Sequence, residues 1–175
     1  MAARTVAIAL ALTLAGIGAG LGAGTGTASA QTPNRIQQFK AWGAYSYKQG
    51  AATVCYVLSV PTTKEPASVD HGDIFFIVSQ RPGQNISYEP QAMVGYTLRE
   101  GSKVNVTIDA KNFVMFTKDK AAWVENAAEE PALVAAMKVG KTMTVKATSG
   151  RGTATSYSYS LSGISAALKQ IETCK

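Results

Sequence analysis

The chain has 175 residues, of which 46% are hydrophobic and 16% are charged, and its formal net charge is +6. This length and apolar content suffice for one ordinary domain with a buried core. The basic excess is modest and spread out, and no stripe of basic and aromatic residues marks a nucleic-acid surface, so we expect no nucleic-acid partner.

The first thirty residues have the pattern of a secretory signal peptide. Arg4 supplies a positive start, residues 6–14 an apolar segment, and residues 28–30 a small-residue cleavage site. A transmembrane anchor is the alternative, but glycines interrupt the apolar run and no charged flank follows it. We therefore expect residues 1–30 to be cleaved during export. The expected destination is the periplasm, with the outer surface or secretion as alternatives, and no later segment reaches the roughly 20 apolar residues of a spanning helix.

The first half of the remaining chain predicts short strands after a polar, mobile lead-in at residues 31–40. Trp42 is expected to be an anchor of the first strand, either in the core or covering an edge of the sheet. Two further strands are apolar on both faces, as in the centre of a two-layer structure. An irregular edge strand, broken by Pro90 and Gly95, is expected last. The predicted strands are residues 42–47, 53–60, 73–79 and 86–96.

The second half predicts a meander, a helix, a hairpin and a second helix. The three meander strands lie near residues 103–109, 113–117 and 121–124. A short helix near 129–139 ends at Gly140, and glycines at 150 and 152 join alternating strands at 142–148 and 153–161. The apolar period then changes to that of a helix near 163–172, with Ser162 as its expected N-cap. Its expected buried stripe is Ile164, Ala167, Leu168 and Ile171. Together these elements predict a single-domain all-β sandwich or barrel.

Cys55 and Cys174 are the only cysteines in the chain. In an exported protein a disulfide between them is the leading interpretation, and two free buried thiols are the alternative. A closed loop of this length is worth about 4–5 kcal/mol in the chain-entropy model. No Cys-x-x-Cys spacing favours a redox-active pair, and no metal ligands accompany the cysteines.

His71 is the only histidine, and it lies in a loop between aspartates. A hydrolase would need it as a base beside a serine on a sharp turn, but no Gly-x-Ser-x-Gly motif is present. We therefore expect a polar loop histidine, no catalytic residue, no cofactor and no metal site. The tyrosine pairs at 45/47 and 157/159 indicate either cross-strand packing or an exposed recognition surface. The candidate interaction surface comprises Tyr157, Tyr159, Lys146 and Arg151.

Residues 136–168 resemble the C-terminal half of the invasion-associated locus B family of bacterial envelope proteins. The matching positions are Lys138, Gly140, Arg151, Gly152, Thr153, Tyr159, Ser160, Leu161, Gly163, Ala166, Ala167 and Leu168. A weaker match extends back to Trp42, and the pattern departs at Ser156-Tyr157, where a more polar position is expected. The resemblance implies a bacterial source, an immunoglobulin-like β-sandwich over residues 41–175, and a role in host-cell invasion or general envelope function.

These observations favour a non-enzymatic exported envelope protein that acts by binding a protein, a glycan or an envelope polymer. A secreted hydrolase that uses His71 is one alternative. A chaperone-like periplasmic factor that pairs through an exposed edge at residues 86–96 is another. The sequence does not predict an oligomeric state.

Overall fold

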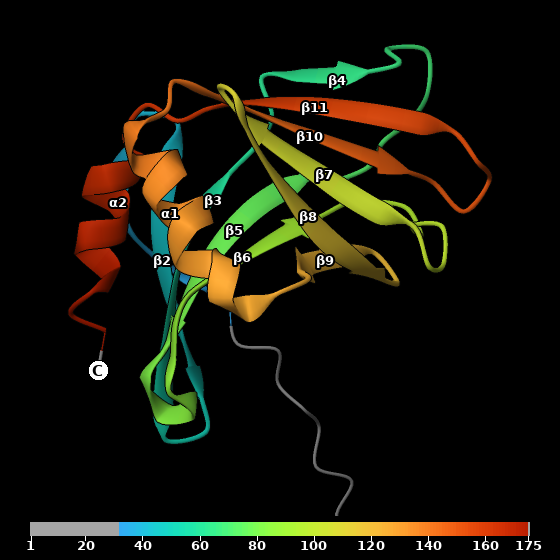
Figure 1. Ribbon diagram of the computed structural model, residues 1–175. Helices are drawn as coiled ribbons and strands as arrows, with labels where there is room; N and C mark the ends of the chain where they lie inside the picture. Colours follow the sequence, from blue (N-terminus) through green and yellow to red (C-terminus); the bar gives the residue numbers. More distant parts are fainter. Residues whose placement is uncertain (1–31, 175) are drawn as a thin grey trace, which may run out of the picture. The chain divides into compact units, whose positions relative to one another are not determined.

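The computed structural model describes residues 32–174, and within this range eleven strands form one antiparallel sheet accompanied by two α-helices (Figure 1). The signal peptide predicted for residues 1–30 lies outside the described residues. The strands are β1 (Asn34–Phe39), β2 (Trp42–Gln49), β3 (Ala52–Ser59), β4 (Thr63–Glu65), β5 (Phe75–Arg81), β6 (Ile86–Met93), β7 (Lys103–Ile108), β8 (Lys111–Lys118), β9 (Ala121–Val124), β10 (Thr142–Thr148) and β11 (Ala154–Ser160). The helices are α1 (Glu130–Val139) and α2 (Ile164–Ile171).

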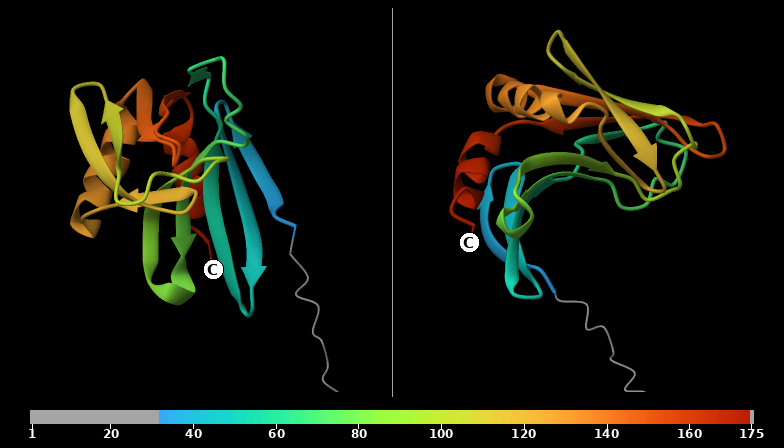
Figure 2. Two further views of the ribbon diagram at one scale, coloured as in Figure 1. Left: turned by 90° about the vertical axis from the view of Figure 1, so that its right-hand side faces the viewer. Right: turned by 60° about the horizontal axis from the view of Figure 1, so that its bottom comes forward.

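The sheet folds over so that its two halves face each other (Figure 2). Its strand order is β1-β2-β3-β5-β6-β9-β8-β7-β10-β11-β4. Phe76 on β5 contacts Tyr159 on β11 edge to face, with ring centroids 6.0 Å apart. The predicted all-β, two-layer architecture with two helices is confirmed. Its layers are joined by the pairing of β6 with β9, for example Gln91 with Trp123, so they form one sheet instead of the two separate sheets of an immunoglobulin-like sandwich.

The C-terminal hairpin supplies one wall of the core. The predicted hairpin of β10 and β11 is confirmed: Val145 pairs with Tyr157, and both side chains are buried. Alternation places one row of each strand inward, Met143, Val145 and Ala147 on β10 and Thr155, Tyr157 and Tyr159 on β11. Trp42 on β2 is fully buried, and its indole Nε1 donates to the Ser160 carbonyl at 3.0 Å, so this residue joins the two layers.

A close contact between the β1–β2 turn and the start of α2 defines a seam, made of Phe39, Ala41, Trp42 and residues 160–163. The Ala41 amide donates to the Ser162 carbonyl at 3.2 Å. Gly163 precedes α2 with a φ of +96°, and a Cβ on it would lie 2.0 Å from the Phe39 carbonyl oxygen. The predicted N-cap at Ser162 is therefore wrong: Gly163 occupies that position because only glycine fits it.

Helix α2 covers β2 and β3 and brings the two cysteines together. Its predicted stripe is buried in full. The helix ends before Cys174, whose sulfur bonds to that of Cys55 on β3, with 5.9 Å between the Cα atoms. The predicted disulfide is thus confirmed, and it connects two positions that are 119 residues apart in the sequence.

Two predicted segments differ from the structure. Residues 34–39 form strand β1 where a mobile lead-in was expected. Five of its six residues are exposed, so its sequence shows no buried row, and its pairing with β2 holds it in place. Residues 86–93 form an interior strand, because β6 pairs with both β5 and β9; the sheet's edges are β1 and β4. Pro90 pairs opposite Val78 within β6, so the proline does not exclude this strand from the interior of the sheet.

Reduction of the Cys55–Cys174 bond should lower the free energy of unfolding by about 4–5 kcal/mol, because the bond closes a loop of 119 residues in the unfolded chain. Urea unfolding followed by circular dichroism, with and without reductant, measures the difference. The double variant Cys55→Ala/Cys174→Ala is the control, and its stability should not respond to reductant. An equal stability of the oxidised and reduced wild type would contradict the prediction.

Gly163→Ala should destabilise the protein by about 3 kcal/mol or more, because it adds a backbone clash to an unfavourable φ. Gly101→Ala is the matched control: Gly101 also has a positive φ, but nothing lies within 4 Å of an added Cβ. The control should lose only about 1–2 kcal/mol. Urea unfolding measures the free energy of unfolding of both variants. If both lose the same amount of stability, the Phe39 backbone can move away from residue 163 at little energetic cost, which would contradict the prediction.

Candidate functional site

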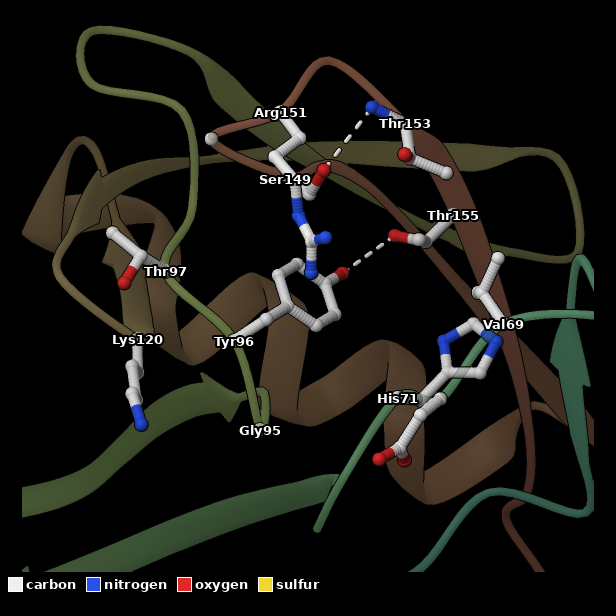
Figure 3. Close-up of a pocket in the computed structure, with 12 residues that line it drawn as sticks. Val69, His71, Gly95, Tyr96, Thr97, Lys120, Ser149, Arg151, Thr153 and Thr155 are labelled. Carbon is white, nitrogen blue, oxygen red and sulfur yellow. Dashed lines mark hydrogen bonds between the residues drawn. The ribbon is translucent and has the colours of Figure 1, made fainter.

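A pocket of about 700 Å³ lies where three connecting segments meet at the end of the sheet that contains the start of β11 (Figure 3). The loop before β5 contributes residues 69–71, the β6–β7 connection residues 95–97, and the β10–β11 turn residues 149–151 and 153. Lys120 from the β8–β9 turn and Thr155 from β11 complete the lining. The pocket is therefore built from segments that are far apart in the sequence.

Gly95 allows two of these segments to touch. A Cβ on this residue would lie 2.4 Å from the His71 carbonyl oxygen and 2.6 Å from the Gly72 Cα. Any larger residue would push the β6–β7 connection away from the loop that carries His71. The same loop is held by Asp70, whose Oδ1 accepts a hydrogen bond from the Gly72 amide at 2.8 Å.

His71 lies in the loop before β5, as expected, and is buried beneath the pocket, with 6% of its surface exposed. Its Nε2 lies 3.0 Å from the Pro66 carbonyl oxygen and its Nδ1 lies 2.9 Å from the Tyr157 hydroxyl. Because a carbonyl oxygen only accepts, Nε2 must carry a hydrogen, and in the neutral ring Nδ1 accepts from Tyr157. Both ring nitrogens are therefore satisfied inside the protein.

The hydrogen bonds continue from Tyr157 to the pocket surface. The hydroxyl oxygens of Tyr157 and Tyr96 are 2.8 Å apart, and Tyr96 lies 2.6 Å from Thr155 Oγ1. Thr155 Oγ1 is also 3.3 Å from the Ala147 carbonyl oxygen. With neutral His71, three hydroxyl hydrogens serve four contacts. Each hydroxyl can then donate toward the ring, Thr155 to Tyr96, Tyr96 to Tyr157 and Tyr157 to Nδ1, and the longest contact, from Thr155 Oγ1 to the Ala147 carbonyl, is left without a hydrogen. We call these four side chains, His71, Tyr157, Tyr96 and Thr155, the relay.

Two of the predicted interaction residues belong to the core. Tyr157 and Tyr159 are 0% and 1% exposed, so the expectation that they present an external surface is wrong, and the packing alternative is correct. Burial raises the pKa of both phenols well above the ordinary value of 10.0. The inward row of β11 places these residues against the facing layer, an orientation that alternation alone does not reveal when both rows of a strand are polar or aromatic.

The two predicted basic residues are exposed but line different hollows. Arg151 lies at the rim of the pocket, where Figure 3 shows its guanidinium reaching from the β10–β11 turn toward the Tyr96 ring. Lys146 lines a separate hollow together with Lys103 and Asn105. Lys120, which the sequence did not single out, shares the pocket with Arg151. Neither the Arg151 nor the Lys120 side chain forms a hydrogen bond or ion pair with another residue between 32 and 174.

The outward face of β2, β3, β5 and β6 is a second candidate surface. Tyr45 and Tyr56 stack with ring centroids 5.3 Å apart, and Tyr47 meets Tyr56 edge to face. A hollow of about 400 Å³ on this face is lined largely by aromatic and aliphatic side chains, including Phe75 and Ile77. Apolar patches of this kind often mark interaction sites.

The geometry does not assemble the hydrolytic site considered from the sequence. The hydrogen-bond partners of His71 are a tyrosine hydroxyl and a backbone carbonyl, and no serine takes either position. Within residues 32–174, no group of three or more histidine, cysteine, aspartate or glutamate side chains is arranged to hold a metal ion. In the same range, neither helix has the length and apolar character needed to cross a membrane.

No pattern in the sequence indicated the relay. Tyr96 is 59 residues from Thr155 and 61 from Tyr157, and His71 is 86 residues from Tyr157. No local spacing connects such residues, and their contact depends on how the sheet folds over.

The stability of the protein should fall as the pH rises above about 10, because the folded state keeps Tyr157 and Tyr159 neutral where an unfolded chain would ionise them. The stabilising effect of these raised pKa values is fully present below the unfolded value and is lost above it. Urea unfolding at about pH 8 and about pH 11 measures the loss. Tyr159→Phe should reduce the loss, and Tyr47→Phe on the outward face is the control. An equally steep loss in the Tyr159 variant would contradict this assignment.

Comparison with known proteins gives one match. The family model for the Invasion associated locus B (IalB) protein matches residues 42–172. This range runs from the first residue of β2 through the end of α2 and includes every segment that lines the pocket. Searches of curated proteins and of solved structures found no match.

Proposed function

The chain belongs to the invasion associated locus B family, and from this premise we propose that it is an exported protein of the bacterial envelope that acts by binding and not by catalysis. The binding site in this proposal is the pocket at the start of β11. Its partner is a protein, a glycan or an envelope polymer, one part of which enters the pocket.

The observation that carries this proposal is the contrast between the pocket's floor and its rim. On the floor, the relay uses the hydrogen-bonding capacity of His71 internally. At the rim, the guanidinium of Arg151 and the ammonium of Lys120 have no partner among residues 32–174. Catalysis by His71 would need a free ring nitrogen beside a nucleophile, whereas recognition needs unpaired groups at an accessible position. The arrangement therefore favours binding over the alternative of a hydrolase that uses His71.

Export is supported by two features of the chain. A disulfide is stable in oxidising compartments, and the bond between Cys55 and Cys174 fits such a location. The first thirty residues have the pattern of a signal peptide. We propose a periplasmic location, which suits a role in envelope maintenance. The alternative is the outer surface, which suits a role in host-cell invasion.

The edge-pairing alternative is not favoured. Residues 86–93 are paired on both sides within the sheet, so the segment considered for that role offers no free edge. The outward aromatic face remains a competing location for binding, and an experiment can separate it from the pocket.

A photo-crosslinking residue placed at Thr97, on the exposed rim of the pocket, should capture a partner when the full chain is expressed in its bacterium and irradiated. Arg151→Ala should weaken this capture about tenfold, because it removes charge-assisted hydrogen bonds. Lys146→Ala removes the same charge from a different hollow and is the matched control. Immunoblotting of the crosslinked species provides the measurement.

The same residue placed at Ile77 reports on the outward face. Capture at Ile77 without capture at Thr97 would move the binding site to that face. If the yield of crosslinked partner at Thr97 is the same with and without Arg151→Ala, then Arg151 does not contribute to binding.

A further inference from the structure

We propose that the pocket is a site for oxyanions, that is, for a ligand that presents a phosphate, sulfate or carboxylate group, and that His71 strengthens this binding when it is protonated. The inference rests on the proposed function, because it names the ligand chemistry of the same pocket. Two observations support it: the rim of the pocket is positively charged, and the hydroxyl groups of the relay can donate their hydrogen bonds either toward His71 or away from it.

Positive charge exceeds negative charge on the pocket lining. Arg151 and Lys120 are the cations, and Asp70 is the carboxylate. One oxygen of Asp70 already accepts from the Gly72 amide, so part of the accepting capacity of this group is used within its own loop. The guanidinium of Arg151 presents a planar set of donors that suits the two oxygens of a carboxylate or phosphate. An anion is therefore the ligand that the unpaired rim groups attract.

Hydroxyl groups supply further donors on the same wall. Ser149 Oγ accepts from the Thr153 amide at 3.1 Å, and its own hydrogen is not used by any bond among residues 32–174. Thr97 and Thr153 also line the pocket. In Figure 3 Ser149 lies beside the Arg151 side chain, while Thr97 and Thr153 lie farther along the pocket wall on either side. A ligand oxygen held by Arg151 would thus meet neutral donors as well.

The relay can accept a proton without leaving a buried donor unpaired. When Nδ1 of His71 is protonated, it donates to Tyr157, and the direction of the chain reverses: Tyr157 donates to Tyr96, Tyr96 to Thr155, and Thr155 to the Ala147 carbonyl oxygen. Nε2 keeps its bond to Pro66. Every donor has an acceptor in both directions, so His71 can become charged without leaving a buried donor unpaired.

Protonation would add a positive charge at the floor of the pocket. The affinity of the pocket for anions should therefore rise when His71 becomes protonated. Other titratable or charged groups lie on the elements around His71, and each affects the electrostatic potential at its ring. They are Tyr157 on β11, Tyr96 on the β6–β7 connection, Lys64 and Glu65 on β4, Asp70 and Asp73 on its own loop, and Arg151 and Lys120 on the rim.

Sulfate is the probe of choice, because its charge does not change over the pH range of the experiment. Titration of the full chain, with its disulfide intact, against sodium sulfate at constant ionic strength can be followed through backbone amide shifts in nuclear magnetic resonance spectra. We expect saturable shifts at residues 149–153 and a dissociation constant about tenfold lower at about pH 5.5 than at about pH 8. Chloride shifts of equal size at the same amides, or sulfate affinity that does not change with pH, would overturn the proposal.

Three variants assign the effect to its groups. Arg151→Ala should weaken sulfate binding about tenfold or more, while Lys146→Ala should not change it. His71→Gln should abolish the pH dependence. Tyr157→Phe removes the acceptor that a charged ring needs at Nδ1, so the rise in affinity should move to lower pH or disappear; it tests the relay if the His71 variant fails to fold. Unchanged pH dependence in a folded Tyr157→Phe or His71→Gln variant would refute the role of the relay.

Competition experiments can identify which molecule supplies the anion. The combined results of crosslinking and sulfate titration can then distinguish the oxyanion site from the proposed function. Vesicles of phosphatidylglycerol that compete with sulfate at residues 149–153, where phosphatidylcholine vesicles do not, would identify a lipid headgroup; competition by inorganic phosphate alone would identify a free or polymer-borne anion. Crosslinking at Thr97 that depends on Arg151, combined with no sulfate binding, would refute the oxyanion site and leave the proposed function standing. Sulfate binding without any crosslinked partner would support the oxyanion site and contradict the proposed function.

Discussion

The approach of the β1–β2 turn to the end of β11 is the contact on which the rest of the structure depends. Gly163 lies against the Phe39 carbonyl, the Ala41 amide bonds to Ser162, and Trp42 spans to Ser160. These contacts hold one half of a continuous sheet over the other, and the inward rows of both halves become a core. Because α2 begins at this point, the seam also sets the direction in which the helix crosses β2 and β3 toward the disulfide.

Strand β11 connects the seam to the pocket, and its inward row changes character along the way. Thr155 and Tyr157 lie at the pocket end, whereas Tyr159 and Leu161 lie at the seam end, and all four side chains are buried. A polar network in a core is tolerated only when its groups are satisfied, because an unpaired buried hydroxyl costs about 1–3 kcal/mol. The relay meets this condition through contacts that only the folded sheet creates. The pocket's polar floor is thus a product of the same folding-over that buries the apolar residues.

The parts of the fold that the sequence predicted correctly are those with a local pattern. The hairpin of β10 and β11 alternates with period two, α1 has its proline and glycine at opposite ends, and α2 has a continuous apolar stripe. The disulfide followed from the presence of only two cysteines. By contrast, β1 is almost wholly exposed and β6 contains a proline, so neither shows the pattern of its true position. Tyr96 and Lys120 of the candidate site could not be identified because only the assembled sheet brings them beside Arg151.

The disulfide can form only late in the synthesis or export of the chain. Cys55 and Cys174 are 119 residues apart, so whether the protein emerges from a ribosome or crosses a membrane from its N-terminus, Cys55 waits as an unpaired thiol while nearly all of the domain follows it. The bond can form only after α2 has arrived, and α2 is the last helix among the described residues. A nascent or shortened polypeptide that lacks this helix cannot acquire the covalent link, whatever the redox potential around it. Oxidation of this pair therefore marks molecules whose synthesis has passed the final helix.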